Sequence, residues 1–103
     1  MTRGPDSAAR LVRALRASAA TRECEVMLEP VRETRWESAT FSGVRHVVAA
    51  TAPTSPDLDD WLAALPETDL PMPGQFVAGV EVSKRSDHEG MAGFTIHALT
   101  IVA

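Results

Sequence analysis

The sequence is poor in cysteine and in long apolar runs, and each scarcity excludes a class of protein or site. Its 103 residues contain one cysteine, Cys24, which excludes an internal disulfide and offers no metal-ligand spacing. No apolar stretch approaches the roughly 18 residues that a membrane-spanning helix needs. We therefore expect one soluble domain, residues 1–103, in a reducing, cytoplasmic setting.

Aromatic residues are also few, with three phenylalanines, two tryptophans and no tyrosine. Residues 1–22 carry five arginines against one aspartate, whereas residues 23–103 carry five basic and thirteen acidic groups, so the net charge is −4. Nine of the ten basic residues are arginine, a bias typical of GC-rich bacterial genomes. Because most of the chain is acidic and has few stacking side chains, we do not expect it to bind nucleic acid.

An amphipathic pattern over residues 5–20 predicts the first helix, with Asp6 or Ser7 as its cap. The segment is similar in composition to a transit peptide, but we favour a retained helix. Its apolar arc consists of Ala8, Leu11, Val12, Leu15 and Ala19. The opposite arc holds Arg10, Arg13 and Arg16, which we interpret as a solvated face, with anion or nucleic-acid binding as the alternative.

From Cys24 onward the apolar period changes from helical to alternating, which predicts a β-hairpin. We expect the first strand to end near Pro30 at a sheet edge, because proline donates no ladder hydrogen bond. The polar stretch 32–35 is interpreted as the turn. A second strand follows over residues 36–50, with Gly43 as a candidate bulge.

The second half of the chain repeats this arrangement. Ser55 followed by Pro56 predicts the start of a short helix, which Pro66 ends. Alternation over residues 75–85 and 93–103 predicts a second hairpin with its turn at residues 86–90. The fold class is therefore α+β in the order α-β-β-α-β-β, with a four-stranded antiparallel sheet and two helices on one face. A shift of about 51 residues superposes His46 on His97, which suggests an internal duplication.

Few residues suggest chemistry. If a two-fold axis relates the two halves, His46 and His97 approach each other near Glu81 and form a cleft for a small ligand or an enzyme reaction. We favour the alternative, in which both histidines are structural or interfacial, since no HxH or HExxH spacing supports a metal. Cys24 occupies an apolar alternating position, which indicates a buried, inert thiol. We expect no catalytic residue, no metal and no other cofactor.

Two helices can cover only one face of the sheet, yet the strands do not become polar on the other. In the third strand we assign Phe76, Ala78, Val80 and Val82 to the core face and Val77 to the uncovered one. We expect a homo-oligomer whose interface contains Val47, Val77, Leu99 and Ile101. The sequence therefore favours a non-catalytic interaction or assembly module, with a different protein partner as the alternative occupant of that face.

Overall fold

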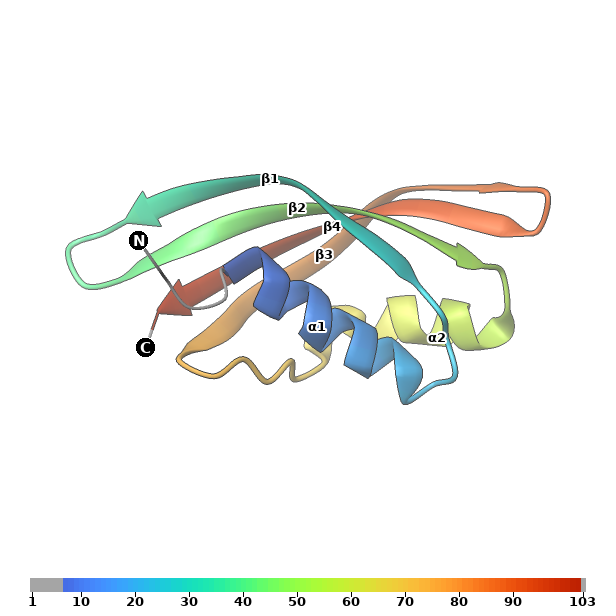
Figure 1. Cartoon of the computed structure of the whole chain (residues 1–103), viewed down its shortest axis with the longest axis horizontal. Coiled ribbons are helices and arrows are strands. Elements are labelled where there is room, and N and C mark those ends of the chain that lie inside the picture. Colours follow the sequence, from blue (N-terminus) through green and yellow to red (C-terminus); the bar gives the residue numbers. More distant parts are fainter. Residues whose placement is uncertain (1–6, 103) are drawn as a thin grey trace.

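Two helices lie on one face of a four-stranded antiparallel sheet, and the other face carries no helix of residues 7–102 (Figure 1). The computed structural model describes residues 7–102 and confirms the predicted α+β class and element order. The strand order is β1-β2-β4-β3, so β1 and β3 are the edges. The elements are α1 (Ser7–Ala20), β1 (Met27–Glu37), β2 (Ser42–Pro53), α2 (Pro56–Ala64), the 3₁₀ turn η1 (Leu65–Glu67), β3 (Gln75–His88) and β4 (Met91–Val102).

Helix α1 buries the apolar arc that the sequence predicts. Leu11, Leu15 and Ala19 are fully buried, and Ala14 joins them. The helix ends in a Schellman motif: the amides of Glu23 and Cys24 donate to the carbonyl oxygens of Ala20 and Ala19 at 3.0 and 2.9 Å. Of the two predicted caps, Asp6 lies outside the described residues, and the Ser7 hydroxyl contacts side chains of the sheet.

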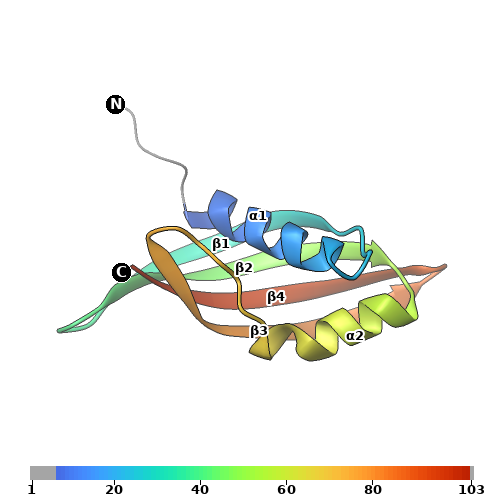
Figure 2. The ribbon, with the colours of Figure 1, turned by 90° about the horizontal axis from the view of Figure 1, so that it is seen from below.

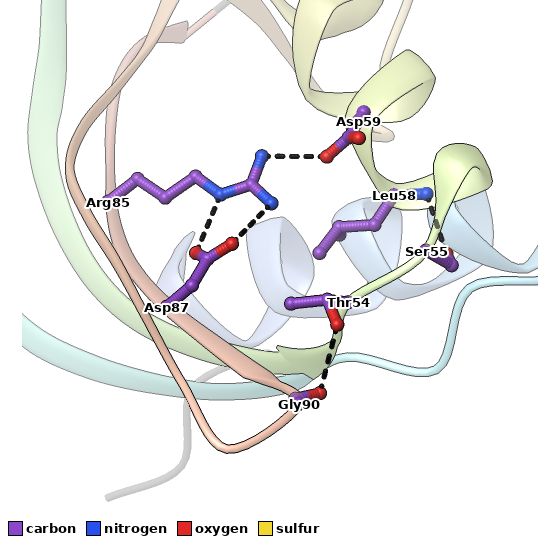
Figure 3. Close-up of polar contacts among 7 residues, drawn as sticks. All are labelled: Thr54, Ser55, Leu58, Asp59, Arg85, Asp87 and Gly90. Atoms are coloured by element: carbon purple, nitrogen blue, oxygen red, sulfur yellow. Dashed lines mark hydrogen bonds and ion pairs between the residues drawn. The ribbon is translucent and has the colours of Figure 1, made fainter.

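Helix α2 begins and ends where the sequence predicts. The Ser55 hydroxyl accepts a hydrogen bond from the Leu58 amide at 3.0 Å, and Pro56 occupies the first turn (Figure 3). Pro66 lies in η1, directly after the helix. Trp61 is buried, and its Nε1 donates to the Ser18 hydroxyl at 3.0 Å, which joins α2 to α1. Figure 2 shows the two helices side by side in front of the sheet.

The first hairpin differs from its predicted boundaries. Strand β1 continues to Glu37, so the predicted turn at residues 32–35 is wrong, and Trp36 belongs to β1 rather than β2. The polar stretch is tolerated because β1 is an edge strand with both faces largely exposed. The turn lies at residues 38–41, where the Ser38 hydroxyl accepts from the Phe41 amide at 3.0 Å. The bulge falls at Val31, after Pro30, and the pairing passes through Gly43 without a shift.

A bulge at Ala78 reverses the predicted faces of the β3 residues that precede it. Val77 lies opposite Thr100 and packs against the core, whereas Phe76 lies opposite Ile101 on the uncovered face. After the bulge, Val80 is buried as predicted. The assignment of Phe76 to the core and of Val77 to the uncovered face is therefore wrong, because one extra residue inverts the alternation on one side of it. Ala78, also assigned to the core, is the exposed bulge residue itself.

Polar contacts fix the tip of the β3–β4 hairpin to the start of α2 (Figure 3). The Arg85 guanidinium forms a bidentate contact with the Asp87 carboxylate, at 2.9 and 3.1 Å, and an ion pair with Asp59 of α2 at 2.9 Å. Hydrogen bonding to Asp87, and then to Asp59, raises the pKa of the Arg85 guanidinium. The turn itself places Glu89 and Gly90 at φ of 51° and 81°, the left-handed pair of a type I′ hairpin.

The helix–hairpin unit occurs twice in the element order, as α1-β1-β2 and α2-β3-β4. The predicted sequence duplication stays a hypothesis. The offset of about 51 residues joins His46 to His97, and these two side chains project from opposite faces of the sheet. The residues of β2 and of β4 that face the helices have even numbers, so an offset that superposes β2 on β4 and preserves the faces would have to be even.

Candidate functional site

The uncovered face of the sheet, hereafter the open face, carries an apolar end and a charged middle. Across its end, the backbone register aligns one row of residues in the order Trp36, Gly43, Ile101 and Phe76. Phe76 is 48% exposed, although a phenylalanine side chain has no polar group to offer water. The next row contains Leu99, and the row after it contains Val47. These side chains form an apolar surface at this end of the open face. Other large apolar side chains are exposed as well, among them Met27, Phe41 and Val102.

The middle of the open face holds a depression of about 540 Å³ that is bordered by charged and polar groups. Arg32 and Arg45 border it from the β1–β2 side, and Glu81 borders it from β3. His97 lies between them, and its Nε2 is 3.1 Å from the Ser83 hydroxyl. The volume is within the range of small-ligand sites.

The predicted interface residues are divided between the two faces. Val47, Leu99 and Ile101 lie on the open face, as expected. Val77 does not, because the Ala78 bulge turns it toward the core. Trp36 and Phe76, the two aromatic residues of this face, were not predicted there. The adjacent Ala78 and Gly79 are the only sequence signal for the bulge, since small residues accommodate such a distortion.

The rings of His46 and His97 do not lie in one cleft, because they project from opposite faces of the sheet. His46 borders the depression but is only 2% exposed, and its Nε2 is 3.1 Å from the Ser7 hydroxyl and 3.2 Å from the Thr100 hydroxyl on the helix side. His97 pairs with Val47, the residue that follows His46 in β2. Successive residues of a strand project to opposite faces, so His97 lies on the open side. The sequence could not fix this parity.

The Ser7–His46 contact resembles a nucleophile with its base, but its surroundings are those of a structural cluster. The Ser7 hydroxyl donates to Gln75 Oε1 at 2.9 Å, and the Thr100 hydroxyl donates to the Val44 carbonyl oxygen at 3.3 Å. The polar groups of α1, β2, β3 and β4 thus satisfy one another beneath α1.

The arginine stripe of α1 is used partly for packing. Arg10 Nη1 donates to the Pro73 carbonyl oxygen at 2.8 Å and so fixes the connector that precedes β3. Arg10 and Arg13 line a groove of about 460 Å³ against that connector, together with Asp69, whereas Arg16 is exposed outside it. The predicted anion-binding stripe is therefore divided, and an acidic group accompanies two of its members.

The remaining reactive groups are isolated. Cys24 is half-buried, and burial followed by the charge of Asp57 raises the pKa of its thiol, while Arg22 acts in the opposite direction. Among residues 7–102, no three His, Cys, Asp or Glu side chains are grouped as metal ligands would be. In the same part of the chain, neither helix has the length and hydrophobicity to cross a membrane.

Comparison with known proteins adds no assignment, because no protein-family model and no curated protein matches the chain.

Proposed function

We propose that this protein is a non-catalytic interaction module that self-associates through its open face, in a cytoplasmic setting. The observation that carries the proposal is the row of large apolar side chains at one end of that face, with Phe76 about half exposed. Burial of apolar surface contributes roughly 25 cal/mol per Å², which favours association wherever the loss of translational freedom is overcome. Aromatic and arginine side chains, which dominate binding energy in protein interfaces, are both present.

A second candidate is a small-ligand binding protein or enzyme that uses the depression beside His97. The gathering of Arg32, Arg45 and Glu81 around that depression supports it. It is the weaker candidate, because the hydroxyl–imidazole pair on this face, Ser83 with His97 at 3.1 Å, has no carboxylate hydrogen-bonded to the histidine among the described residues. A thermal-shift screen with small carboxylates and phosphates tests it: stabilisation that is lost in Arg45→Gln and retained in Arg16→Gln would favour ligand binding over self-association.

The proposal is tested by light scattering on the purified protein at tens of micromolar. We expect a mass at least twice the 11.1 kDa of the chain. Phe76→Lys combined with Leu99→Lys should return the mass to that of the monomer without changing the circular dichroism spectrum, because both side chains are partly exposed. Ala17→Lys is the matched control, since Ala17 is exposed on α1, on the helix-covered side of the sheet. A wild-type mass near 11.1 kDa would refute the proposal.

A further inference from the structure

The middle of the open face brings basic side chains together from all four strands. Arg32 of β1, Arg45 of β2 and His97 of β4 border the depression of about 540 Å³. A second depression, of about 340 Å³, is bordered by Arg32, His97 and Lys84 of β3. Because the two depressions share Arg32, Val47 and His97, they form one trough across the sheet, hereafter the central trough.

This gathering of cations runs against the charge of the surrounding chain. Residues 23–103 contain five basic and thirteen acidic groups, and three of the five basic groups, Arg32, Arg45 and Lys84, border the central trough. Among residues 7–102, Glu81 is the one acidic group that borders it. None of these four side chains forms an ion pair within the same residues. Since cations that are brought together repel one another, an anion bound among them would remove that repulsion.

A bulge in β3 directs Lys84 toward the trough at a conformational cost. The pairing of β3 with β4 shifts between Ser83 and Ser86, so β3 has one extra residue there. Arg85 is held on the helix side by Asp59 of α2 (Figure 3), whereas Lys84 borders the open face. The φ of Lys84 is 57°, in the left-handed region where a side chain is strained. Bulges that re-aim a side chain, and strain of this kind, are over-represented beside functional sites.

The strand register places the cations on either side of His97. Arg45 lies opposite Leu99, two residues beyond His97 on β4. Lys84 borders the other depression together with Thr95, two residues before His97. The shared part of the central trough, at His97, is therefore flanked by a cation in each direction along the strands.

The lining favours a phosphate monoester as the ligand. Guanidinium groups bind carboxylates and phosphates through paired N–H donors. A carboxylate brings one negative charge and two oxygens, whereas a phosphate monoester at neutral pH brings roughly 1.5 to 2 charges and three terminal oxygens, which suits several converging cations better. Each depression lies within the size range of small-ligand sites. The apolar part of the lining, which suits the organic part of an ester, consists of Val47, Ala49 and Leu99.

We propose that the central trough binds a small phosphate monoester. Its phosphate lies beside Arg32 and His97, in the part that the two depressions share. Arg45 and Lys84 flank the phosphate from opposite sides, and the organic part packs on Leu99. This inference rests on the second candidate function, since it names the ligand class of that site. It does not require self-association, because the apolar end row of the open face is outside the lining of the trough.

Isothermal titration calorimetry with phenyl phosphate tests the proposal, because this probe joins a phosphate monoester to an apolar ring. We expect a dissociation constant below about 1 mM in a buffer of low salt without phosphate. Arg32→Gln and Arg45→Gln should each raise it about tenfold, as expected for the loss of a charge-assisted hydrogen bond. Arg35→Gln is the matched control, since it removes the same charge from β1 opposite Val44, on the helix side, and should leave the constant unchanged.

Lys84 allows a test that a structural role would not pass. Lys84→Gly removes the cation and relieves the left-handed backbone, so it should weaken the binding of phenyl phosphate about tenfold while it raises the urea midpoint. Lys84→Arg keeps the charge and should bind as wild type does. Circular dichroism establishes that the variants fold. If Lys84→Gly is stabilised but binds phenyl phosphate normally, the assignment of Lys84 to the site is overturned.

Further outcomes test the ligand class and separate this inference from self-association. Absence of binding in both calorimetry and a thermal-shift assay refutes the proposal and leaves the three cations as charges that protect the sheet from aggregation. Phenylacetate that binds as tightly as phenyl phosphate overturns the choice of phosphate, and inorganic phosphate that does so overturns the role of the apolar lining. In light scattering, a monomer that binds phenyl phosphate refutes self-association alone, whereas a dimer that does not bind it refutes this inference alone.

Discussion

Gly43 lies against the indole of Trp36, and this contact leaves no space for a side chain at position 43. A methyl group there would overlap the carbonyl oxygen of Thr100 and stand 2.9 Å from Trp36 Nε1. The same indole nitrogen is buried without a hydrogen-bond partner among the described residues, so the aromatic ring is held by packing. Gly43 therefore permits a close approach between strands; it is not a bulge.

Gly43→Ala should lower the free energy of unfolding by about 2 kcal/mol or more, because the backbone of β2 or β4 must move to admit the methyl group. Urea denaturation measures the effect. Gly93→Ala is the control, since the corresponding methyl group would meet only the Ser86 carbonyl oxygen at an ordinary 3.9 Å. Equal stability of the two variants would show that the close approach does not exist in solution.

His46→Ala should lower the free energy of unfolding by about 3 kcal/mol, because it leaves a cavity and removes hydrogen bonds from Ser7 and Thr100. His97→Ala, on the open face, should cost less than about 1 kcal/mol. Metal analysis on protein purified without a histidine tag accompanies this comparison. A stoichiometric metal that disappears in His46→Ala would contradict the structural role.

Glu23→Gly should raise the free energy of unfolding by about 1 kcal/mol. Glu23 closes the Schellman motif of α1 with φ of 57°, a conformation in which a side chain is strained and glycine is not. At Glu25, which has no positive φ, substitution by glycine should lower stability through the entropy of the unfolded chain. If both variants lose stability, the left-handed cap is not formed.

The sequence was sufficient for the fold class because its signals were local. The apolar arc of α1 and the Ser55–Pro56 cap each follow from residues within one or two turns, and both elements formed as predicted. The β1–β2 turn was misplaced because polar residues on an edge strand and in a turn have the same composition. What decides between them is pairing with β2, which is a long-range contact.

The open face could be predicted only in part, because its composition depends on strand parity. Residues on uninterrupted strands, such as Leu99 and Ile101, were assigned to the correct face. A single bulge at Ala78 exchanged Phe76 and Val77, and nothing in the alternation of apolar residues reveals an inserted residue. The separation of His46 from His97 has the same cause, since no local pattern sets the register of β2 against β4.

The thiol of Cys24 should react slowly in the folded protein. Its pKa is raised above the ordinary 9.0, first by burial and then by the negative charge of Asp57, while Arg22 partly offsets both. Because the thiolate is the nucleophile, alkylation by iodoacetamide at pH 8 should be slower in the folded chain than in urea. Asp57→Asn should accelerate the reaction, and Arg22→Gln should slow it further.

The same raised pKa makes stability depend on pH in one direction. The folded state keeps the Cys24 proton at a pH where the unfolded state has begun to lose it, so the contribution is complete below the unfolded pKa. It is lost as pH rises from the unfolded pKa through the folded pKa, because unfolding in that interval releases the proton and a rising pH favours the state that has released it. The free energy of unfolding should therefore fall more steeply above about pH 9 in wild type than in Cys24→Ser, which has no thiol to titrate. Urea denaturation of both proteins between pH 7 and 10.5 isolates this difference from other titrating groups. Parallel curves for the two proteins would mean that Cys24 is equally hydrated in the folded and unfolded chains.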